Sequence, residues 1–108
     1  MFEYWMNARL DRLATVQITS GRAFNGDQGA NLFGVKVEGV SSLTGTVSAN
    51  IVKPDGTTIT QSGSKDGNKA WVVLPEAAYT VKGKIIIAIK LTNGTEVATL
   101  GAFEIYVR

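Results

Sequence analysis

The sequence contains no cysteine and no histidine among its 108 residues. These two absences exclude a disulfide framework, a zinc site of the common kind, a thiol nucleophile and a histidine-based catalytic triad. They also exclude a histidine that changes charge near neutral pH. Because no recognisable pair of nucleophile and base is left, we expect a protein that is not an enzyme and that needs no cofactor or metal.

Long apolar runs and concentrated positive charge are also missing. No stretch approaches the roughly 20 apolar residues of a membrane-spanning helix. The apolar start, Met1 to Met6, is interrupted by Glu3 and lacks the basic residues that begin a signal peptide. Eleven Lys and Arg residues against nine Asp and Glu residues give a net charge of +2, and the basic residues are scattered. We therefore expect neither membrane insertion nor nucleic-acid binding, and the absence of cysteine fits synthesis in a reducing cytoplasm.

The composition is that of one globular domain. Hydrophobic residues make up 44% of the chain and charged residues 19%, which is too apolar for disorder. We expect a single domain over residues 13–108, preceded by an N-terminal arm over residues 1–12. The arm stands out because three of the nine aromatic residues and both methionines lie in its first six positions. The spacing of Met6, Leu10 and Leu13 also allows one or two helical turns there.

Alternation of apolar and polar residues predicts strands through the rest of the chain. The clearest cases are Leu32 to Val37 and Lys84 to Thr92, in which every second residue is apolar. Pro75 to Val81 is the one helix-like piece, since proline suits a first helical turn. Further strands are expected over residues 13–20, 47–52, 57–61, 70–74 and 95–108.

Two turn motifs separate these strands. In Lys53-Pro54-Asp55-Gly56 the proline presets its own backbone angle and the glycine accepts a positive φ. Asn93-Gly94 is the strongest short signal for a β-hairpin. Short strands at this spacing predict an all-β fold, an immunoglobulin-like antiparallel β-sandwich of about seven strands.

None of the glycine, serine or carboxylate patterns indicates catalysis or metal binding. The glycines of residues 26–34 lack the spacing of a phosphate-binding loop. Ser62-Gly63-Ser64-Lys65 lacks the spacing of a serine–lysine nucleophile motif, and Asp66-Gly67-Asn68 lacks the alternating acidic pattern of a calcium loop. We interpret all three as turns and loops.

The apolar arm is the strongest candidate for a binding site. It either folds back over its own sandwich or docks on a neighbouring subunit, because exposed apolar patches mark contacts of one kind or the other. In the second case Phe2, Tyr4, Trp5 and Met6 carry a protein–protein contact. The loop from Arg22 to Ala30, with Arg22 and Phe24, is a second candidate. Trp71 is expected in the core, since it lies in a strongly apolar strand.

From about Asn25 onward, the sequence resembles the N-terminal domain of the phage baseplate upper proteins. The likeness covers about three quarters of the chain and rests on an ordered series of motifs. The series is Gly26-Asp27, the strand Leu32 to Val37, Leu43-Thr44-Gly45, Lys53 to Gly56, Leu74-Pro75, Gly83 after a short helical turn, a long apolar strand, Asn93-Gly94, and the final Phe103, Ile105 and Val107.

The resemblance implies a non-enzymatic virion protein that acts through protein–protein contacts, with no catalytic residues. Its partners would be other virion proteins, in many copies on a symmetric particle, and it would be made in the host cytoplasm. Family members usually carry further domains after this module. The resemblance itself implies a baseplate component. Because this sequence ends just after the last strand, a small stand-alone virion component is favoured over it, such as a capsid decoration protein, the base of a head fibre, or a tail or neck accessory. Deletion of residues 1–12 is then expected to leave the sandwich folded and to abolish incorporation into particles.

The alternative is a module that binds host-surface glycans. Such a module needs an exposed tyrosine or tryptophan on a strand, with carboxylates or amides beside it. Tyr106 with Glu104 and Arg108, on one face of the last strand, is the nearest match. Alternation alone also explains these residues as a half-solvated sandwich face.

Overall fold

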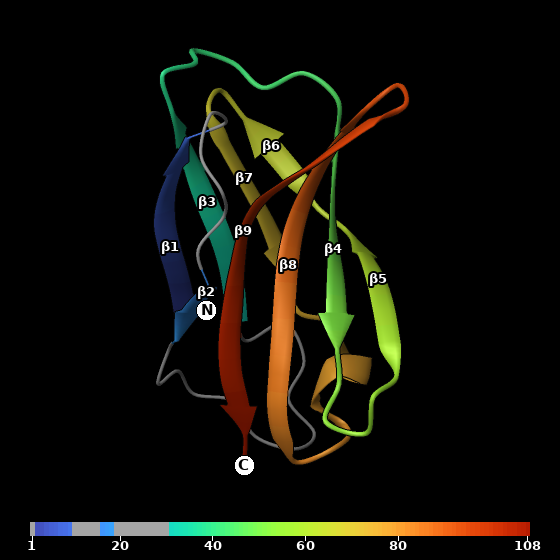
Figure 1. The fold of residues 1–108 in the computed structure, drawn as a ribbon. Coiled ribbons are helices and arrows are strands. Elements are labelled where there is room, and N and C mark those ends of the chain that lie inside the picture. Colours follow the sequence, from blue (N-terminus) through green and yellow to red (C-terminus); the bar gives the residue numbers. More distant parts are fainter. Residues whose placement is uncertain (1, 10–15, 19–30) are drawn as a thin grey trace.

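The computed structural model describes residues 2–9, 16–18 and 31–108, and this part of the chain is almost entirely β-structure (Figure 1). Its strands form a four-stranded sheet and a five-stranded sheet, which pack face to face. The predicted all-β sandwich is therefore confirmed, with nine strands in the described residues where about seven were expected. The immunoglobulin-like detail stays a prediction.

The strand order is β1-β3-β7-β6 in one sheet and β2-β9-β8-β4-β5 in the other. The first sheet consists of β1 (Phe2–Arg9), β3 (Asn31–Glu38), β7 (Lys69–Val73) and β6 (Ser64–Asp66). The second consists of β2 (Val16–Ile18), β9 (Glu96–Val107), β8 (Gly83–Asn93), β4 (Thr46–Val52) and β5 (Thr58–Ser62).

The core lies between the two sheets and follows from the period-two alternation of the strands. Phe33 in β3 and Phe103 in β9 meet there with ring centroids 5.1 Å apart. Each fully buried large apolar side chain contributes roughly 1.5–3 kcal/mol to folding. The other large side chains with almost no exposure are Tyr79, Ile51, Leu74, Ile85, Ile87, Ile89, Ile105, Val35, Val37 and Val72.

Tight turns join neighbouring strands of the five-stranded sheet. In the β4–β5 turn the backbone N–H of Gly56 donates to the Lys53 carbonyl at 2.9 Å, and Gly56 has a φ of +86°. The carboxylate of Asp55 accepts hydrogen bonds from the Thr57 hydroxyl at 2.6 Å and its backbone N–H at 3.0 Å. The predicted turn chemistry at this position is confirmed.

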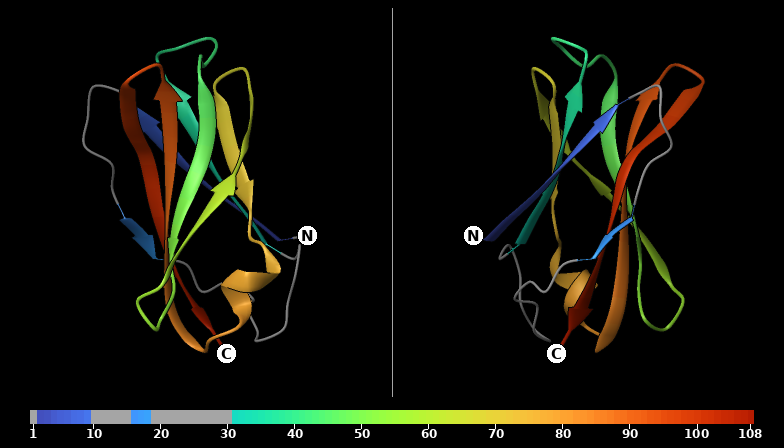
Figure 2. Two further views of the ribbon diagram at one scale, coloured as in Figure 1. Left: turned by 90° about the vertical axis from the view of Figure 1, so that its right-hand side faces the viewer. Right: turned by 60° about the vertical axis from the view of Figure 1, so that its left-hand side comes forward.

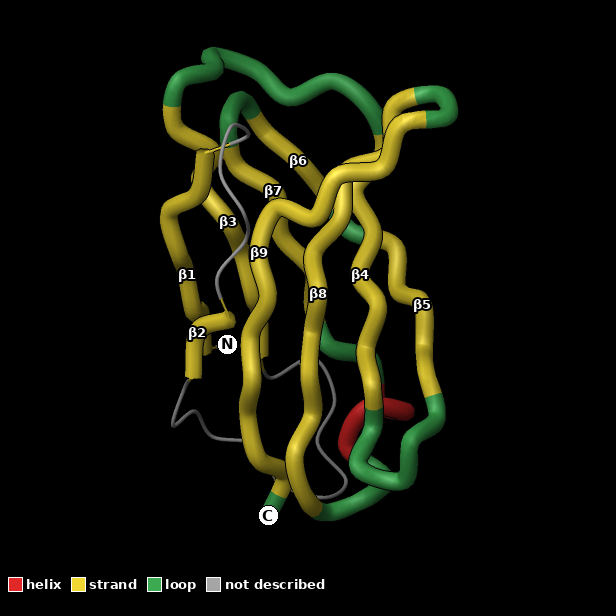
Figure 3. The backbone as a smooth tube through the Cα atoms, in the orientation of Figure 1, coloured by secondary structure: helices red, strands yellow, loops and turns green. Residues whose placement is uncertain are grey.

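The β8–β9 hairpin turns at Asn93-Gly94, as predicted, and bends away from the sandwich at its tip (Figure 3). A register shift between Ile89 and Lys90 marks a β-bulge, which strengthens the local twist of a strand pair. Beyond the bulge Val97 is 61% exposed, whereas Leu100 and Phe103 return to the core. The bulge thus separates an exposed hairpin tip from a buried ladder.

The expected helical turn is a 3-10 helix over Glu76–Tyr79 that closes one end of the core. Tyr79 is fully buried, and the side-chain amide of Asn31 donates to its hydroxyl oxygen at 2.9 Å. The backbone N–H of Leu74 also donates to the Asn31 carbonyl at 3.1 Å. These bonds fix the start of β3 against the segment that follows β7.

Residues 2–9 form a strand of the sandwich, where an arm outside it was expected. β1 runs parallel to β3 in an eight-residue register from Phe2 opposite Asn31 to Arg9 opposite Glu38 (Figure 2). The reason is alternation, because Tyr4, Met6 and Ala8 pack against the core and the intervening side chains point outward. Of the strand expected over residues 13–20, only β2 lies in the described part, and β6 occupies a segment that was expected to be a loop.

Candidate binding surfaces

β1 packs against the sandwich through its inward-facing side chains. The ring of Tyr4 stacks on Phe33 with centroids 5.1 Å apart and planes 18° apart. On the same side Met6 lies over Gly101, where an added Cβ would come within 2.7 Å of the methionine sulfur. β1 therefore covers part of the core, with Tyr4 on the Phe33 ring and Met6 in the space that Gly101 leaves free.

The outward side of the same strand carries Trp5, which meets Trp71 across a glycine. Trp5, Gly34 and Trp71 are direct partners in β1, β3 and β7. The two indoles are arranged edge to face, with ring centroids 6.3 Å apart and planes 60° apart, which is a favourable geometry for aromatic pairs. A Cβ on Gly34 would lie 2.4 Å from the Trp5 ring, so this row requires glycine at its centre.

A hollow of about 310 Å³ opens beside this pair on the outer face of the four-stranded sheet. We call it the tryptophan hollow, and its lining residues are Glu3, Trp5, Leu32, Asp66, Lys69 and Trp71. The Trp5 indole N–H donates to the Glu3 carboxylate at 3.0 Å. Asp66 and Lys69 are partners across β6 and β7. Aromatic, anionic and cationic side chains thus surround one small space.

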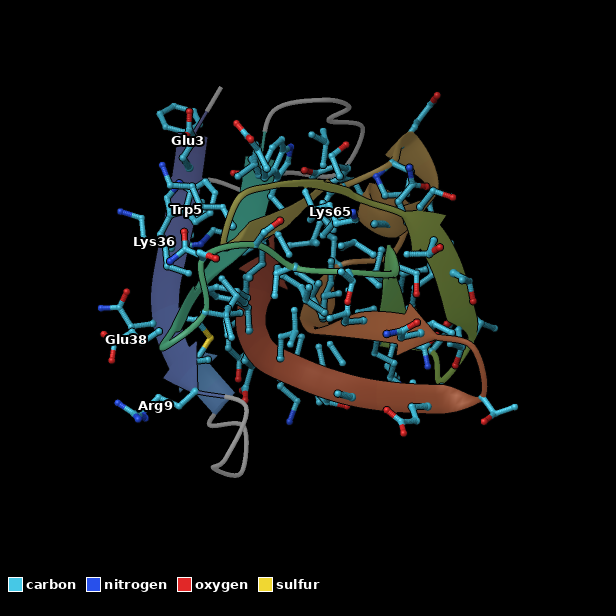
Figure 4. All side chains as sticks on the ribbon, turned by 90° about the horizontal axis from the view of Figure 1, so that it is seen from above. Glu3, Trp5, Arg9, Lys36, Glu38 and Lys65 are labelled. Atoms are coloured by element: carbon cyan, nitrogen blue, oxygen red, sulfur yellow. The ribbon has the colours of Figure 1, made fainter. Side chains whose placement is uncertain are left out.

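Charged residues continue along this side of the molecule beyond the hollow. Figure 4 shows Glu3 and Trp5 followed by Lys36, Glu38 and Arg9. The register places Arg9 opposite Glu38 at the end of β1. The outer face of the four-stranded sheet therefore carries both signs of charge over its whole length.

The outer face of the five-stranded sheet has a different character. Val52, Ile86 and Glu104 form one row across β4, β8 and β9, and Asn50, Ala88 and Ala102 form the next. Tyr106 lies beside Lys84 in the row on the other side. Val52 is 39% and Tyr106 52% exposed, and Ile86 and Ala88 are half-buried. We call this surface, Val52, Ile86, Ala88 and Tyr106, the apolar face.

The structure separates the residues that were expected to form one apolar tip. Tyr4 and Met6 pack against the core of their own chain, Trp5 lines the hollow, and Phe2 is 45% exposed at the start of β1. Arg22 and Phe24 lie outside the described residues. Tyr106 and Glu104 do share the outer face of β9, and Arg108 is exposed just after it.

Two residues of the hollow were interpreted differently from the sequence. Trp71 was expected in the core and instead lies half-buried on the outer face, because Ala70 and Val72 take the inward positions of β7. Asp66 was assigned to a turn and instead belongs to β6. The strand Ala70 to Leu74 is apolar on both sides, so alternation could not decide which side faces the core.

Within the described residues, no group of three or more Asp and Glu side chains gathers where it could hold a metal ion. No helix in this part of the chain is long and apolar enough to cross a membrane. No protein-family model matches the sequence, and no curated protein matches it.

Proposed function

We propose that this chain is a non-enzymatic structural protein of a bacteriophage particle, and that it holds a neighbouring protein subunit through the apolar face. The observation that carries the proposal is the row pattern on the outer side of β4, β8 and β9. It brings the exposed Val52 and Tyr106 onto one face with the half-buried Ile86 and Ala88. The series of motifs that resembles the phage baseplate upper proteins supports the type of particle.

The composition of the apolar face suits contact with another protein. Protein interfaces place apolar and aromatic residues at the centre and charged residues at the rim. Here Ile86 and Ala88 lie at the centre, Glu104 lies beside Ile86 in the same row, and Lys84 lies in the next row. Strands about 4.8 Å apart in a hydrogen-bonded sheet also form a surface that changes little on binding.

A symmetric particle would use this surface many times. Homo-oligomers and virion proteins occupy symmetric sites, so one weak contact is repeated over the assembly. The baseplate, tail, neck and head are all compatible locations for a small sandwich of this kind. In each of them the partner is another virion protein or a second copy of the chain.

A cryo-EM map of the phage particle whose genome encodes this sequence tests the proposal. We expect the sandwich to be traced in the particle with Val52 and Tyr106 buried against a neighbouring subunit. Absence of the chain from purified particles, checked by mass spectrometry, would contradict the virion role. A trace with the apolar face in solvent would contradict the proposed contact alone.

A further inference from the structure

The tryptophan hollow is independent of the apolar face, since the two surfaces lie on the outer sides of different sheets. We propose that this hollow is a carbohydrate site, in which one ring of a neutral oligosaccharide stacks on the exposed part of the tryptophan pair. The site differs from the glycan alternative at Tyr106, and it does not depend on the proposed role in a particle.

The tryptophan pair supplies the stacking surface. Trp5 and Trp71 are both half-buried and are arranged edge to face, so they do not cover each other's faces by stacking. The electron-rich face of an indole attracts C–H groups that carry partial positive charge, and one side of a pyranose ring presents such groups. Gly34 has no side chain and the Trp5 ring lies over it, so the two indoles meet with no third side chain between them.

The polar groups around the hollow match sugar hydroxyls. Carboxylates such as Glu3 and Asp66 only accept hydrogen bonds, and a hydroxyl group can donate to them. The ammonium group of Lys69 only donates, and the same hydroxyl group can accept from it. Glu3 is also held in place by the Trp5 indole N–H at 3.0 Å, so one acceptor is ordered before a ligand arrives.

The same groups disfavour other ligands that stack on aromatic residues. Two carboxylates against one ammonium group leave the hollow with net negative charge, which repels anionic sugars and phosphates. Proline-rich peptides also dock in aromatic grooves, but proline has no N–H to donate to Glu3 or Asp66. The volume of about 310 Å³ is at the lower limit for ligand pockets, which suits one sugar ring.

Intrinsic fluorescence provides a direct assay, because the chain has two tryptophans and both line the hollow. The full-length protein is titrated with cellotetraose, chitotetraose and maltotetraose, each up to millimolar concentration. We expect at least one of them to shift the tryptophan emission in a saturable way. A heparin tetrasaccharide and decaproline serve as anionic and peptide probes and are expected to give no saturable change.

Three variants locate the site, with binding measured by calorimetry so that the loss of a tryptophan does not affect the readout. Trp71→Ala is expected to weaken binding roughly tenfold, the loss of one aromatic contact. Asp66→Asn, on the exposed strand β6, is expected to weaken it several-fold without disturbing the fold. Tyr106→Ala, the exposed aromatic of the other sheet, is expected to bind as the parent does.

The outcomes that overturn the proposal are equally specific. Failure of all three tetrasaccharides to bind at millimolar concentration excludes a neutral carbohydrate site of this kind. Binding that is lost with Tyr106→Ala and kept with Trp71→Ala moves the site to the other sheet. Preferential binding of the heparin tetrasaccharide or of decaproline would show that the ligand is an anionic sugar or a proline-rich peptide and not a neutral oligosaccharide. Thermal unfolding of each variant shows whether a loss of binding reflects a loss of fold. If Trp71→Ala does not fold, the binding affinity of Asp66→Asn decides whether the ligand occupies the hollow.

Discussion

The two sheets differ in how their strands are brought together. In the five-stranded sheet, β4 and β5 are joined by the turn that begins at Lys53, and β8 and β9 form a hairpin, so each of these two pairs joins neighbours in the chain. In the four-stranded sheet, β3 lies between two strands from distant segments, with Phe2 opposite Asn31 and Leu32 opposite Val73. Local turns thus make two of the four pairings in the five-stranded sheet and only the β6–β7 pairing in the other; the remaining pairings join segments that are far apart in the sequence.

The two sheets also differ in their outer faces. On the five-stranded sheet, Val52 and Ile86 are of similar size and lie side by side. On the four-stranded sheet, Gly34 lies between two tryptophans, the smallest residue between two of the largest. The Trp5 ring lies over this glycine and the tryptophan hollow opens beside the pair, whereas Val52 and Ile86 leave no comparable step in side-chain size. The two sheets therefore carry different kinds of outer surface.

The strongest test of the comparison is the removal of β1. Because Tyr4 and Met6 pack on the core, we expect deletion of residues 1–12 to lower the free energy of unfolding by roughly 3–5 kcal/mol, as for the loss of large core side chains. This replaces the expectation that the body of the sandwich is unaffected. Urea denaturation measures this free energy. Asn7→Ala, at an outward position of β1, is the control and is expected to leave it almost unchanged. An unchanged midpoint would show that β1 is an independent arm after all.

Gly34→Ala tests whether the four-stranded sheet depends on its glycine. The new Cβ would meet the Trp5 ring, so we expect overpacking to lower the free energy of unfolding by about 1–3 kcal/mol. The tryptophan emission is also expected to shift, since Trp5 must move. The matched variant on the other sheet is Ala88→Val, for which we expect the free energy of unfolding to change by less than about 0.5 kcal/mol. Equal losses in the two variants would remove the contrast between the faces.

Val52→Lys sharpens the contrast from the side of the five-stranded sheet. Val52 is 39% exposed, so we expect the free energy of unfolding of the variant to differ from that of the parent by less than about 0.5 kcal/mol. Occupancy in phage particles is nevertheless expected to fall, because a charge is placed in the proposed interface. Occupancy is measured by quantitative mass spectrometry of purified particles. Val97→Lys, at the exposed hairpin tip, is the control that should assemble normally.

The smallest effect is expected at the β4–β5 turn. Hydrogen bonds from the hydroxyl and backbone N–H of Thr57 lower the pKa of the exposed Asp55 carboxyl. A lowered pKa in the folded state means that the contribution to stability is present at neutral pH and disappears as acid protonates the carboxylate. Asp55→Asn should therefore reduce stability slightly at pH 7 and converge with the parent in acid. Thermal unfolding across that pH range checks this, and a constant difference would contradict it.

The sequence predicts the five-stranded sheet better than the four-stranded one, for physical reasons. The Lys53–Gly56 turn and the alternation of Ile85, Ile87 and Ile89 are local signals, and both predict the observed elements. β1 was missed because outward Trp5 is as apolar as inward Tyr4, which conceals the alternation. The tryptophan hollow combines β1, β3, β6 and β7, and no local pattern reports such a combination.

The parallel pairing of the first strands determines how the domain responds to mechanical force. β1 lies parallel to β3, and β2 lies parallel to β9. A load applied along the axis of β1 or β2 displaces that strand along a partner that runs in the same direction. The hydrogen bonds of each ladder are then strained together in shear, where an antiparallel hairpin pulled at its open end would unzip one bond at a time. Resistance to a load along the strand axes would for this reason depend on the eight-residue register of β1 with β3 more than on the three-residue register of β2 with β9.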